Sequence, residues 1–256
     1  MEGFRDIPAL GFSATELMAL IFSRNLLRPL DGTELQASLS SALMKAAAAL
    51  PPQGHEYVRE MERIFAVGLG PHKSYQRHRG IIDRIAEAIS RARSAQMRYE
   101  SIARNATTRR EVDPYRLWYA AGGLYLIGYC HLRKDVRMFA VERIRSIAFT
   151  DHPYQRPLAF NIDEYVQDAL TVMRGRRMEV ELLFSKQAAG WVKDKVWHSS
   201  QEVSLLKDGR LRLTLKVADT AELVGWILSF GSQVRVVRPD ALRQKVKEEA
   251  GKIFRS

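Results

Sequence analysis

The chain has 256 residues, a formal net charge of +11 and a hydrophobic content of 46%, which allows one to three domains with a sizeable core. A single cysteine excludes an internal disulfide and indicates a reducing compartment. No apolar run approaches the roughly 18 residues of a membrane helix, and residues 1–12 lack the basic-then-apolar layout of a signal peptide. We therefore expect a cytoplasmic protein without a membrane partner.

The positive charge is densest in residues 101–157, which hold 10 Lys and Arg against 5 Asp and Glu. A positive surface attracts polyanions through counterion release and electrostatic steering. The alternative is a generally basic protein, because charge alone carries no specificity.

Residues 1–94 are predicted to be a helical region that connects and dimerises. Residues 13–16 (Ser-Ala-Thr-Glu) fit a capping box, in which the serine and the glutamate satisfy each other's backbone amides. Apolar residues recur on one helical face over residues 35–50, and a helical stripe of isoleucines follows over residues 81–89. The segment 57–67 fits either a strand or a helix.

The middle of the chain, rich in aromatic and β-branched residues, predicts an antiparallel meander. Val112–Ala121, Leu124–His131 and Val136–Val141 are the predicted strands, and Glu142–Phe149 is a further short one. Gly122-Gly123 is the predicted two-residue turn of the first hairpin, because glycine reaches positive φ without steric cost. Such a meander packs one face and can leave the other in water.

Side chains in a strand alternate between the two faces of the sheet. In residues 124–131 one face carries the small and aliphatic residues Leu124, Leu126, Gly128 and Cys130, which suit a core. The opposite face carries Tyr125, Ile127, Tyr129 and His131, which suit ligand recognition. Arg137 shares a face with Phe139, and Arg143 follows just beyond. Two guanidiniums near two tyrosines would bind phosphate and stack on bases.

Four separated pieces of this stretch resemble the WYL domain of bacterial transcription regulators: Pro114-Tyr115-Arg116-Leu117, Leu124–Tyr129, Arg137-Met138-Phe139 and Glu142-Arg143-Ile144. The Trp-Tyr-Leu triplet that names the family is Leu124-Tyr125-Leu126 here. The resemblance implies a small Sm-like (SH3-like) β-barrel that senses a ligand, often a nucleic-acid fragment or a nucleotide. It also implies an N-terminal winged helix-turn-helix, which we expect this chain to lack because about a dozen residues precede Ser13.

Residues 158–177 are predicted to be a connector with a short helix over 163–173. Residues 178–256 alternate as strand–helix–strand–strand–helix–strand, the order of a ferredoxin-like split βαβ unit, with Asp219 as the expected N-cap of the second helix. This part resembles the extension domain that follows the barrel in WYL regulators. The predicted fold is α+β, with a helical region (1–94), a WYL barrel (95–157), a connector (158–177) and a C-terminal ferredoxin-like domain (178–256).

Catalysis is not expected. None of the six histidines pairs with a cysteine or another histidine at metal-ligand spacing, and no phosphate-binding or dinucleotide glycine pattern occurs. Cys130 is expected to pack inward rather than act as a nucleophile. We therefore predict a non-enzymatic protein without a cofactor.

The candidate ligand-binding residues are Tyr99, Arg110, Tyr115, Tyr125, Tyr129, His131, Arg137 and Arg143. The alternatives are ion pairing of the arginines with Asp135 or Glu142 and ordinary packing of the tyrosines. The assignment of Arg110 to the site depends on the strand register, because a shift of one residue would move its side chain to the other face of the sheet.

The function predicted from these residues is that of a homodimeric, ligand-sensing transcriptional regulator. Its barrel would bind a nucleic-acid fragment, a nucleotide or another small anionic effector. Its output would pass through a DNA-binding partner protein or through a longer parent chain. Two other hypotheses are an interaction and oligomerisation module without a ligand, and a sequence-independent binder of single-stranded nucleic acid.

Overall fold

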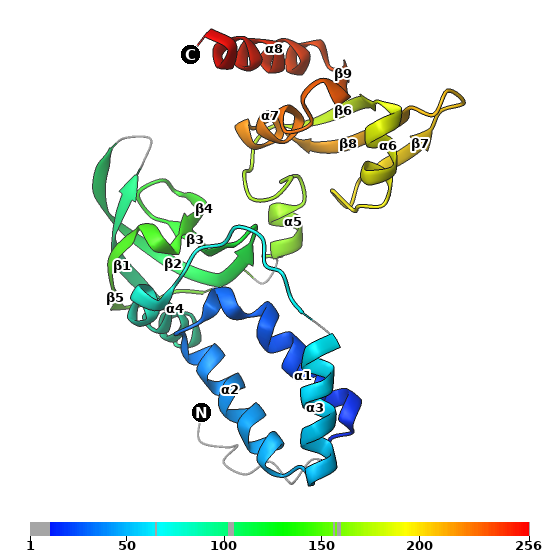
Figure 1. The fold of residues 1–256 in the computed structure, drawn as a ribbon. Helices are drawn as coiled ribbons and strands as arrows, with labels where there is room; N and C mark the ends of the chain where they lie inside the picture. The colour runs from blue at the N-terminus through cyan, green and yellow to red at the C-terminus, as the bar shows by residue number, and fades with distance from the viewer. Residues whose placement is uncertain (1–10, 65, 102–104, 156, 158–159, 256) are drawn as a thin grey trace. The chain divides into compact units, whose positions relative to one another are not determined.

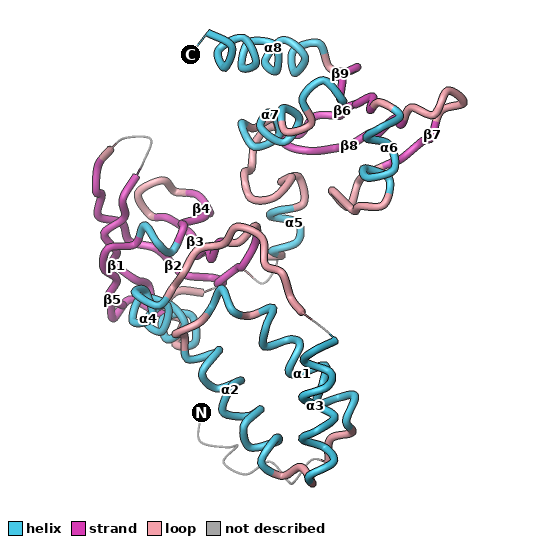
Figure 2. Tube along the Cα trace, in the orientation of Figure 1, coloured by secondary structure: helices cyan, strands magenta, loops and turns pink. Residues whose placement is uncertain are grey.

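The computed structural model describes residues 11–64, 66–101, 105–155, 157 and 160–255 (Figure 1). The fold is α+β, as predicted, and the chain divides into two compact units, Met1–Arg156 and Pro157–Ser256. Figure 2 shows that each unit contains its own β-sheet. The finer division into four segments remains a prediction, and so do the names Sm-like barrel and ferredoxin-like domain.

The first unit begins with three helices: α1 (Ala14–Leu26), α2 (Glu34–Ala48) and α3 (Pro52–Ile64). The capping box at α1 is confirmed: the Ser13 hydroxyl accepts from the Glu16 amide, and the Glu16 carboxylate accepts from the Ser13 amide at 2.8 Å. The Ser13 amide and, as the smaller cause, the Ser13 hydroxyl at 2.9 Å both donate to the Glu16 carboxylate, and these two hydrogen bonds lower the pKa of the Glu16 carboxyl. The segment that fitted either a strand or a helix lies mostly in α3. Buried Leu17 and Leu43 join the helices in a small core, whereas Leu35 of the predicted stripe is 62% exposed.

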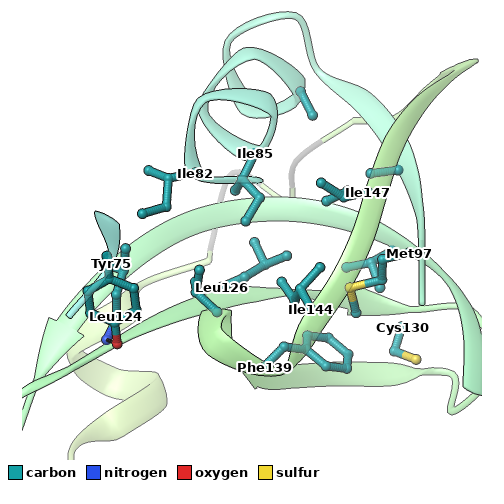
Figure 3. Packing of buried hydrophobic residues seen from close by; sticks show 14 of the residues in the cluster. Tyr75, Ile82, Ile85, Met97, Leu124, Leu126, Cys130, Phe139, Ile144 and Ile147 are labelled. Atoms are coloured by element: carbon teal, nitrogen blue, oxygen red, sulfur yellow. Dashed lines mark hydrogen bonds between the residues drawn. The ribbon is translucent and has the colours of Figure 1, made fainter. Parts of the chain in front are cut away.

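The helix α4 (Arg79–Ser90) covers a five-stranded antiparallel sheet in the order β4-β3-β2-β1-β5. Its strands are β1 (Arg93–Ser101), β2 (Ala106–Ala120), β3 (Gly123–Cys130), β4 (Asp135–Ala140) and β5 (Ile144–Pro153), with a 3-10 turn, Val141–Arg143, between the last two. Figure 3 shows Ile82 and Ile85 of α4 directed at Leu126 and Ile144 of the sheet. The predicted inward packing of Cys130 is confirmed, since its side chain is fully buried.

The structure corrects several predicted element ends. The first hairpin turns at Ala121-Gly122, not at Gly122-Gly123, because both residues have positive φ (48° and 74°), and Gly123 already belongs to β3. This is the backbone pattern of a type I′ turn. His131 lies in the turn after β3, and Glu142 lies in the 3-10 turn rather than in a strand. β2 begins at Ala106, ahead of the predicted strand start at Val112.

The second unit contains a four-stranded antiparallel sheet in the order β7-β8-β6-β9. Its elements are α5 (Ile162–Val166), β6 (Arg177–Phe184), α6 (Lys186–Lys193), β7 (Glu202–Leu205), β8 (Leu211–Ala218), α7 (Ala221–Leu228), β9 (Val234–Arg238) and α8 (Asp240–Arg255). The predicted element order is therefore present.

Two details of the second unit differ from the sequence prediction. Thr220, not Asp219, caps α7, because its hydroxyl accepts from the Leu223 amide while the Asp219 carboxylate pairs with Lys245. The helix expected over 163–173 ends at Val166. The Ala169 amide donates to the Val166 carbonyl oxygen in a tight turn, and the amides of residues 171–173 donate to the Glu222 carboxylate instead of to helical carbonyl groups.

No helix in the described part of the chain is long and apolar enough to cross a membrane. Within the same residues, no group of three or more His, Cys, Asp and Glu side chains is placed to hold a metal ion.

Candidate ligand-binding site

The β1–β5 sheet has two faces that divide the predicted site residues. We call the face that carries the core residues Met97, Val112 and Leu126 the inner face, and the opposite one the outer face. Arg110 pairs with Met97 across β1 and β2 and is two residues from Val112, so it belongs to the inner face. Tyr99, which packs against the same core, belongs there too.

Arg110 is a buried guanidinium, with 9% of the residue exposed. Its Nε donates to Thr108 Oγ1 at 3.1 Å, and its Nη1 lies 3.7 Å from Cys130 Sγ. Its Cζ lies 5.8 Å from the ring centroids of both Tyr99 and Phe139. Among the residues that the structure describes, no carboxylate lies within 4.0 Å of this cation. Cation–π contacts offset only part of the free energy of burying a charge, so an anion at this position would be strongly stabilised.

Arg137 lies on the same inner face, because it pairs with Gly128 and is two residues from Phe139. Its side chain is 52% exposed and forms an ion pair with Asp135 at 3.2 Å, the partner considered as an alternative to ligand binding. Exposed ion pairs contribute little stability, so this pairing leaves the guanidinium available for a ligand. A Cβ at Gly128 would collide with the Asp113 carbonyl oxygen, which explains the glycine opposite Arg137.

Tyr125 and Tyr129 lie on the outer face, away from Arg137. In the register of β3 and β4 they pair with Ala140 and Val136, and residues directly opposite each other in an antiparallel pair point to the same side. The expectation that these tyrosines and Arg137 form one surface is therefore wrong, because neighbouring positions in a strand alternate. Tyr125 packs at a tilt on Trp118, with ring centroids 6.1 Å apart.

The remaining predicted residues are dispersed. Tyr115 is buried, with its ring centroid 5.9 Å from that of Tyr154, next to an irregularity in β2 between Pro114 and Arg116. Arg143 lies half-buried in the 3-10 turn before β5. Of the predicted set, the structure thus places Arg110 beside Tyr99 and puts Arg137 on the same face. On the outer side, the ring centroids of Tyr129 and His131 lie 5.3 Å apart.

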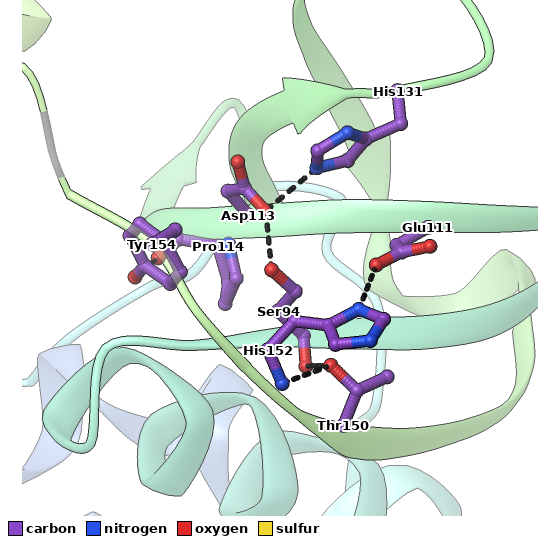
Figure 4. A network of polar contacts seen from close by, with 8 residues as sticks. All are labelled: Ser94, Glu111, Asp113, Pro114, His131, Thr150, His152 and Tyr154. Atoms are coloured by element: carbon purple, nitrogen blue, oxygen red, sulfur yellow. Dashed lines mark hydrogen bonds and ion pairs between the residues drawn. The ribbon is translucent and has the colours of Figure 1, made fainter.

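His131 takes part in a polar network that the sequence did not reveal (Figure 4). Its Nε2 lies 2.8 Å from Asp113 Oδ1, which also accepts the Ser94 hydroxyl at 2.6 Å. Ser94 is 3% and Asp113 is 8% exposed. The serine is bonded to the carboxylate and not to the imidazole, so the arrangement is not that of an activated nucleophile. The only sign of this network in the sequence is an acidic residue, Asp113, inside a predicted strand between Val112 and Pro114.

Thr108, Cys130 and Phe139 also belong to the Arg110 environment and were not among the predicted site residues. Period-two alternation from Tyr99 and Arg110 places Met97 and Thr108 on the inner face, but the contacts with Cys130 and Phe139 depend on the pairing of β2, β3 and β4.

Two family models match this chain: the WYL domain over residues 80–149 and the WCX domain over residues 176–254. The first covers α4 and the β1–β5 sheet, and the second covers most of the second unit. The chain therefore contains a WYL domain followed by a WCX domain.

Among curated relatives, the HTH-type transcriptional regulator YobV of Bacillus subtilis is 26% identical over 82% of this chain and 66% of its own length. PafC of Mycobacterium tuberculosis is 25% identical over 65% of this chain and 51% of its own length. PafC of Mycobacterium leprae is 22% identical over 94% of this chain and 71% of its own length. The chain thus spans between about half and two thirds of the first two relatives.

The solved structures that match the chain include a proteasome accessory factor and a CRISPR Cas-related protein. The proteasome accessory factor B/C (PafBC) of Arthrobacter aurescens is 24% identical, with 96% of this chain and 36% of that chain covered and a TM-score of 0.34. A CRISPR Cas-related protein is 12% identical, with 97% and 75% covered and a TM-score of 0.49. Neither likeness, at a TM-score below 0.5, bears on function.

Proposed function

We propose that this chain is the sensing part of a transcriptional regulator, and that the inner face of its WYL domain binds an anionic effector such as a nucleic-acid fragment or a nucleotide. The observation that carries the proposal is the buried Arg110 guanidinium, which has aromatic rings beside it and no carboxylate partner among the described residues.

The chemistry around Arg110 suits a phosphate attached to a base. A guanidinium presents a planar fork of donors that matches phosphate oxygens, and half-buried Tyr99 supplies an aromatic ring of the kind on which bases stack. Arg137, on the same face, adds a second, exposed cation. A bound anion would also neutralise the buried charge, which gives the ligand a direct influence on the stability of this face.

The regulatory part of the proposal is supported by the relatives. YobV is an HTH-type transcriptional regulator and is 26% identical over 82% of this chain, which itself contains WYL and WCX domains. We propose that the effector signal reaches DNA through a DNA-binding segment or partner protein, and that the chain works as a homodimer. This role requires no cofactor and no catalysis.

The experiment measures fluorescence anisotropy of labelled single-stranded DNA and RNA fragments with the purified chain over a salt series. Arg110→Ala, Arg110→Lys and Arg137→Ala are compared with wild type. The matched control is Arg116→Ala, which removes an exposed arginine from the same strand as Arg110. A melting curve for each variant separates loss of binding from loss of fold.

We expect the Arg110 and Arg137 variants to bind about tenfold more weakly or worse, because each loses a charge-assisted hydrogen bond to phosphate. The Arg116→Ala control should bind as wild type does. Folded wild type that binds neither nucleic-acid fragments nor nucleotides at low salt would refute the proposal and favour an interaction module. Binding that increases steadily with strand length and is unaffected at Arg110 would favour a sequence-independent binder.

A further inference from the structure

A second cluster of arginines lies on the outer face of the same sheet. There an open hollow of about 580 Å³ crosses β2, β1 and β5. The side chains that matter for the argument are Arg84, Arg98, Arg109, Gln96, Ser146 and Glu111. Arg110 is the only one of the predicted ligand-binding residues that borders this hollow. Its side chain, however, belongs to the inner face.

Arg98 and Arg109 face each other directly across β1 and β2. Both residues are exposed, and neither side chain forms a hydrogen bond or an ion pair with another described residue. Two like charges directly opposite each other destabilise a strand pair. The sheet therefore carries a repulsive pair that a bound anion would turn into an attractive one.

Arg84 brings a third guanidinium to the hollow from α4. Its Nη1 donates to the carbonyl oxygen of Ile147 in the edge strand β5 at 3.0 Å, which fixes the side chain while leaving its other donors free to bind a ligand. This hydrogen bond also explains the position of Arg84 on the α4 face that is not part of the isoleucine stripe.

The carboxylates near the hollow are already engaged. Glu111 Oε1 lies 2.9 Å from His152 Nδ1, and Glu100 forms an ion pair with Arg145. Three guanidiniums thus face one lining carboxylate. Gln96 and Ser146 add neutral donors, and no aromatic side chain among the described residues lines the hollow. The chemistry therefore suits phosphate groups rather than stacked bases.

We infer that this outer-face hollow is a phosphate-binding site whose guanidiniums, those of Arg84, Arg98 and Arg109, are not those of the inner-face site. The phosphate can come from the backbone of a nucleic-acid strand or from a free polyphosphate. In both cases the phosphate binds between the guanidiniums of Arg98 and Arg109, and Arg84 contacts it from the side of β5.

The test compares wild type with the double variant Arg98→Gln/Arg109→Gln. The control, Arg116→Gln/Arg133→Gln, removes the same charge from exposed arginines of the same unit that do not line the hollow. Melting temperatures are measured at low salt with and without sodium tripolyphosphate. Anisotropy of a labelled abasic single-stranded DNA is measured over a salt series, because an abasic strand offers phosphates without bases.

Without any anion, the double variant should melt at a higher temperature than wild type, because the repulsion between the two guanidiniums is gone. It should also lack the rise in melting temperature that tripolyphosphate gives wild type. With the abasic strand, its log–log salt slope should be shallower by about 1.4, or about 0.7 for each phosphate that an arginine no longer neutralises. The control should keep the tripolyphosphate response and most of the slope.

The two ligands separate the two sources of phosphate. Loss of the tripolyphosphate response alone assigns the site to free polyphosphate, and loss of the strand slope alone assigns it to a nucleic-acid backbone. A double variant that behaves like the control with both ligands overturns the inference. The inner-face proposal depends on Arg110 and Arg137, whereas this one depends on Arg98 and Arg109, so a failure of one and a failure of the other are distinguishable.

Discussion

The hydroxyl of Tyr75 offers a test of how the core of the first unit is held together. Tyr75 is fully buried, and its oxygen accepts from the Leu124 amide at the start of β3 (Figure 3). The same oxygen lies 3.5 Å from Glu142 Oε2. Tyr75→Phe removes that oxygen and keeps the ring. A buried amide left without an acceptor costs about 1–3 kcal/mol, so the free energy of unfolding should fall by about that amount.

The same substitution changes the response to alkaline pH. Burial, the largest cause, raises the pKa of the Tyr75 hydroxyl above its ordinary value, and the nearby Glu142 carboxylate adds to the effect. The protonated phenol is therefore favoured in the folded state. Its contribution to stability is complete below the ordinary pKa of about 10 and is lost as the pH rises above it, because the unfolded tyrosine ionises first. Tyr75→Phe should make this alkaline loss of stability shallower.

Native-state hydrogen exchange measures the first effect, because amides of β1–β5 report on this unit and amides of β6–β9 serve as an internal control. Protection of the slowest β1–β5 amides should fall roughly 5- to 150-fold, the equivalent of 1–3 kcal/mol. Urea unfolding followed by circular dichroism between pH 8 and pH 11 measures the second effect. Unchanged protection in β3, together with the same alkaline slope in both proteins, would refute this reasoning.

Three further substitutions test other interactions. Asp113→Ala leaves the buried Ser94 hydroxyl without its acceptor and should destabilise the first unit by about 2–4 kcal/mol in urea unfolding. Adding Ser94→Ala should restore part of this loss, and strict additivity of the two changes would contradict the hydrogen bond. Gly128→Ala places a Cβ against a backbone oxygen and should lower stability by about 1–3 kcal/mol; a variant with wild-type melting would show that β2 can move. Glu222→Gln replaces a carboxylate that accepts hydrogen bonds from the amides of residues 171–173 at 3.1–3.2 Å with a weaker, neutral acceptor. Hydrogen exchange at residues 172 and 173 should become about tenfold faster, and unchanged exchange there would argue against these bonds.

The two arginine clusters have different relations to the core of the WYL domain. Arg110 is buried on the inner face, so its ligand would be coupled to the packing of Tyr99 and Phe139. Arg98 and Arg109 are exposed on the outer face, so their ligand would mainly relieve repulsion. The expected consequence is that an inner-face ligand changes core dynamics, whereas an outer-face ligand changes mainly the salt dependence of binding.

Local chemistry and periodicity were sufficient to predict several features from the sequence. The capping box at Ser13, the isoleucine face of α4 and the inward direction of Cys130 depend on interactions within a few residues or on simple alternation. Glycine marked the first hairpin, but the turn lies one residue earlier because Ala121 also takes a positive φ. The order of elements from Arg177 to the last helix likewise followed from alternating apolar patterns and turn residues.

The composition of the candidate site was decided by tertiary structure. The sequence identified Tyr99, Arg110, Arg137 and the tyrosines of β3 as chemically suitable residues, but it could not determine which of them share a face. That depends on the pairing of β3 with β4, where Gly128 meets Arg137 and Tyr129 meets Val136. The opposition of Arg98 and Arg109 likewise follows from the register of β1 and β2. Alternation along one strand is a local property, whereas register between strands is set by packing of the whole sheet, and for that reason the site could be read only from the folded chain.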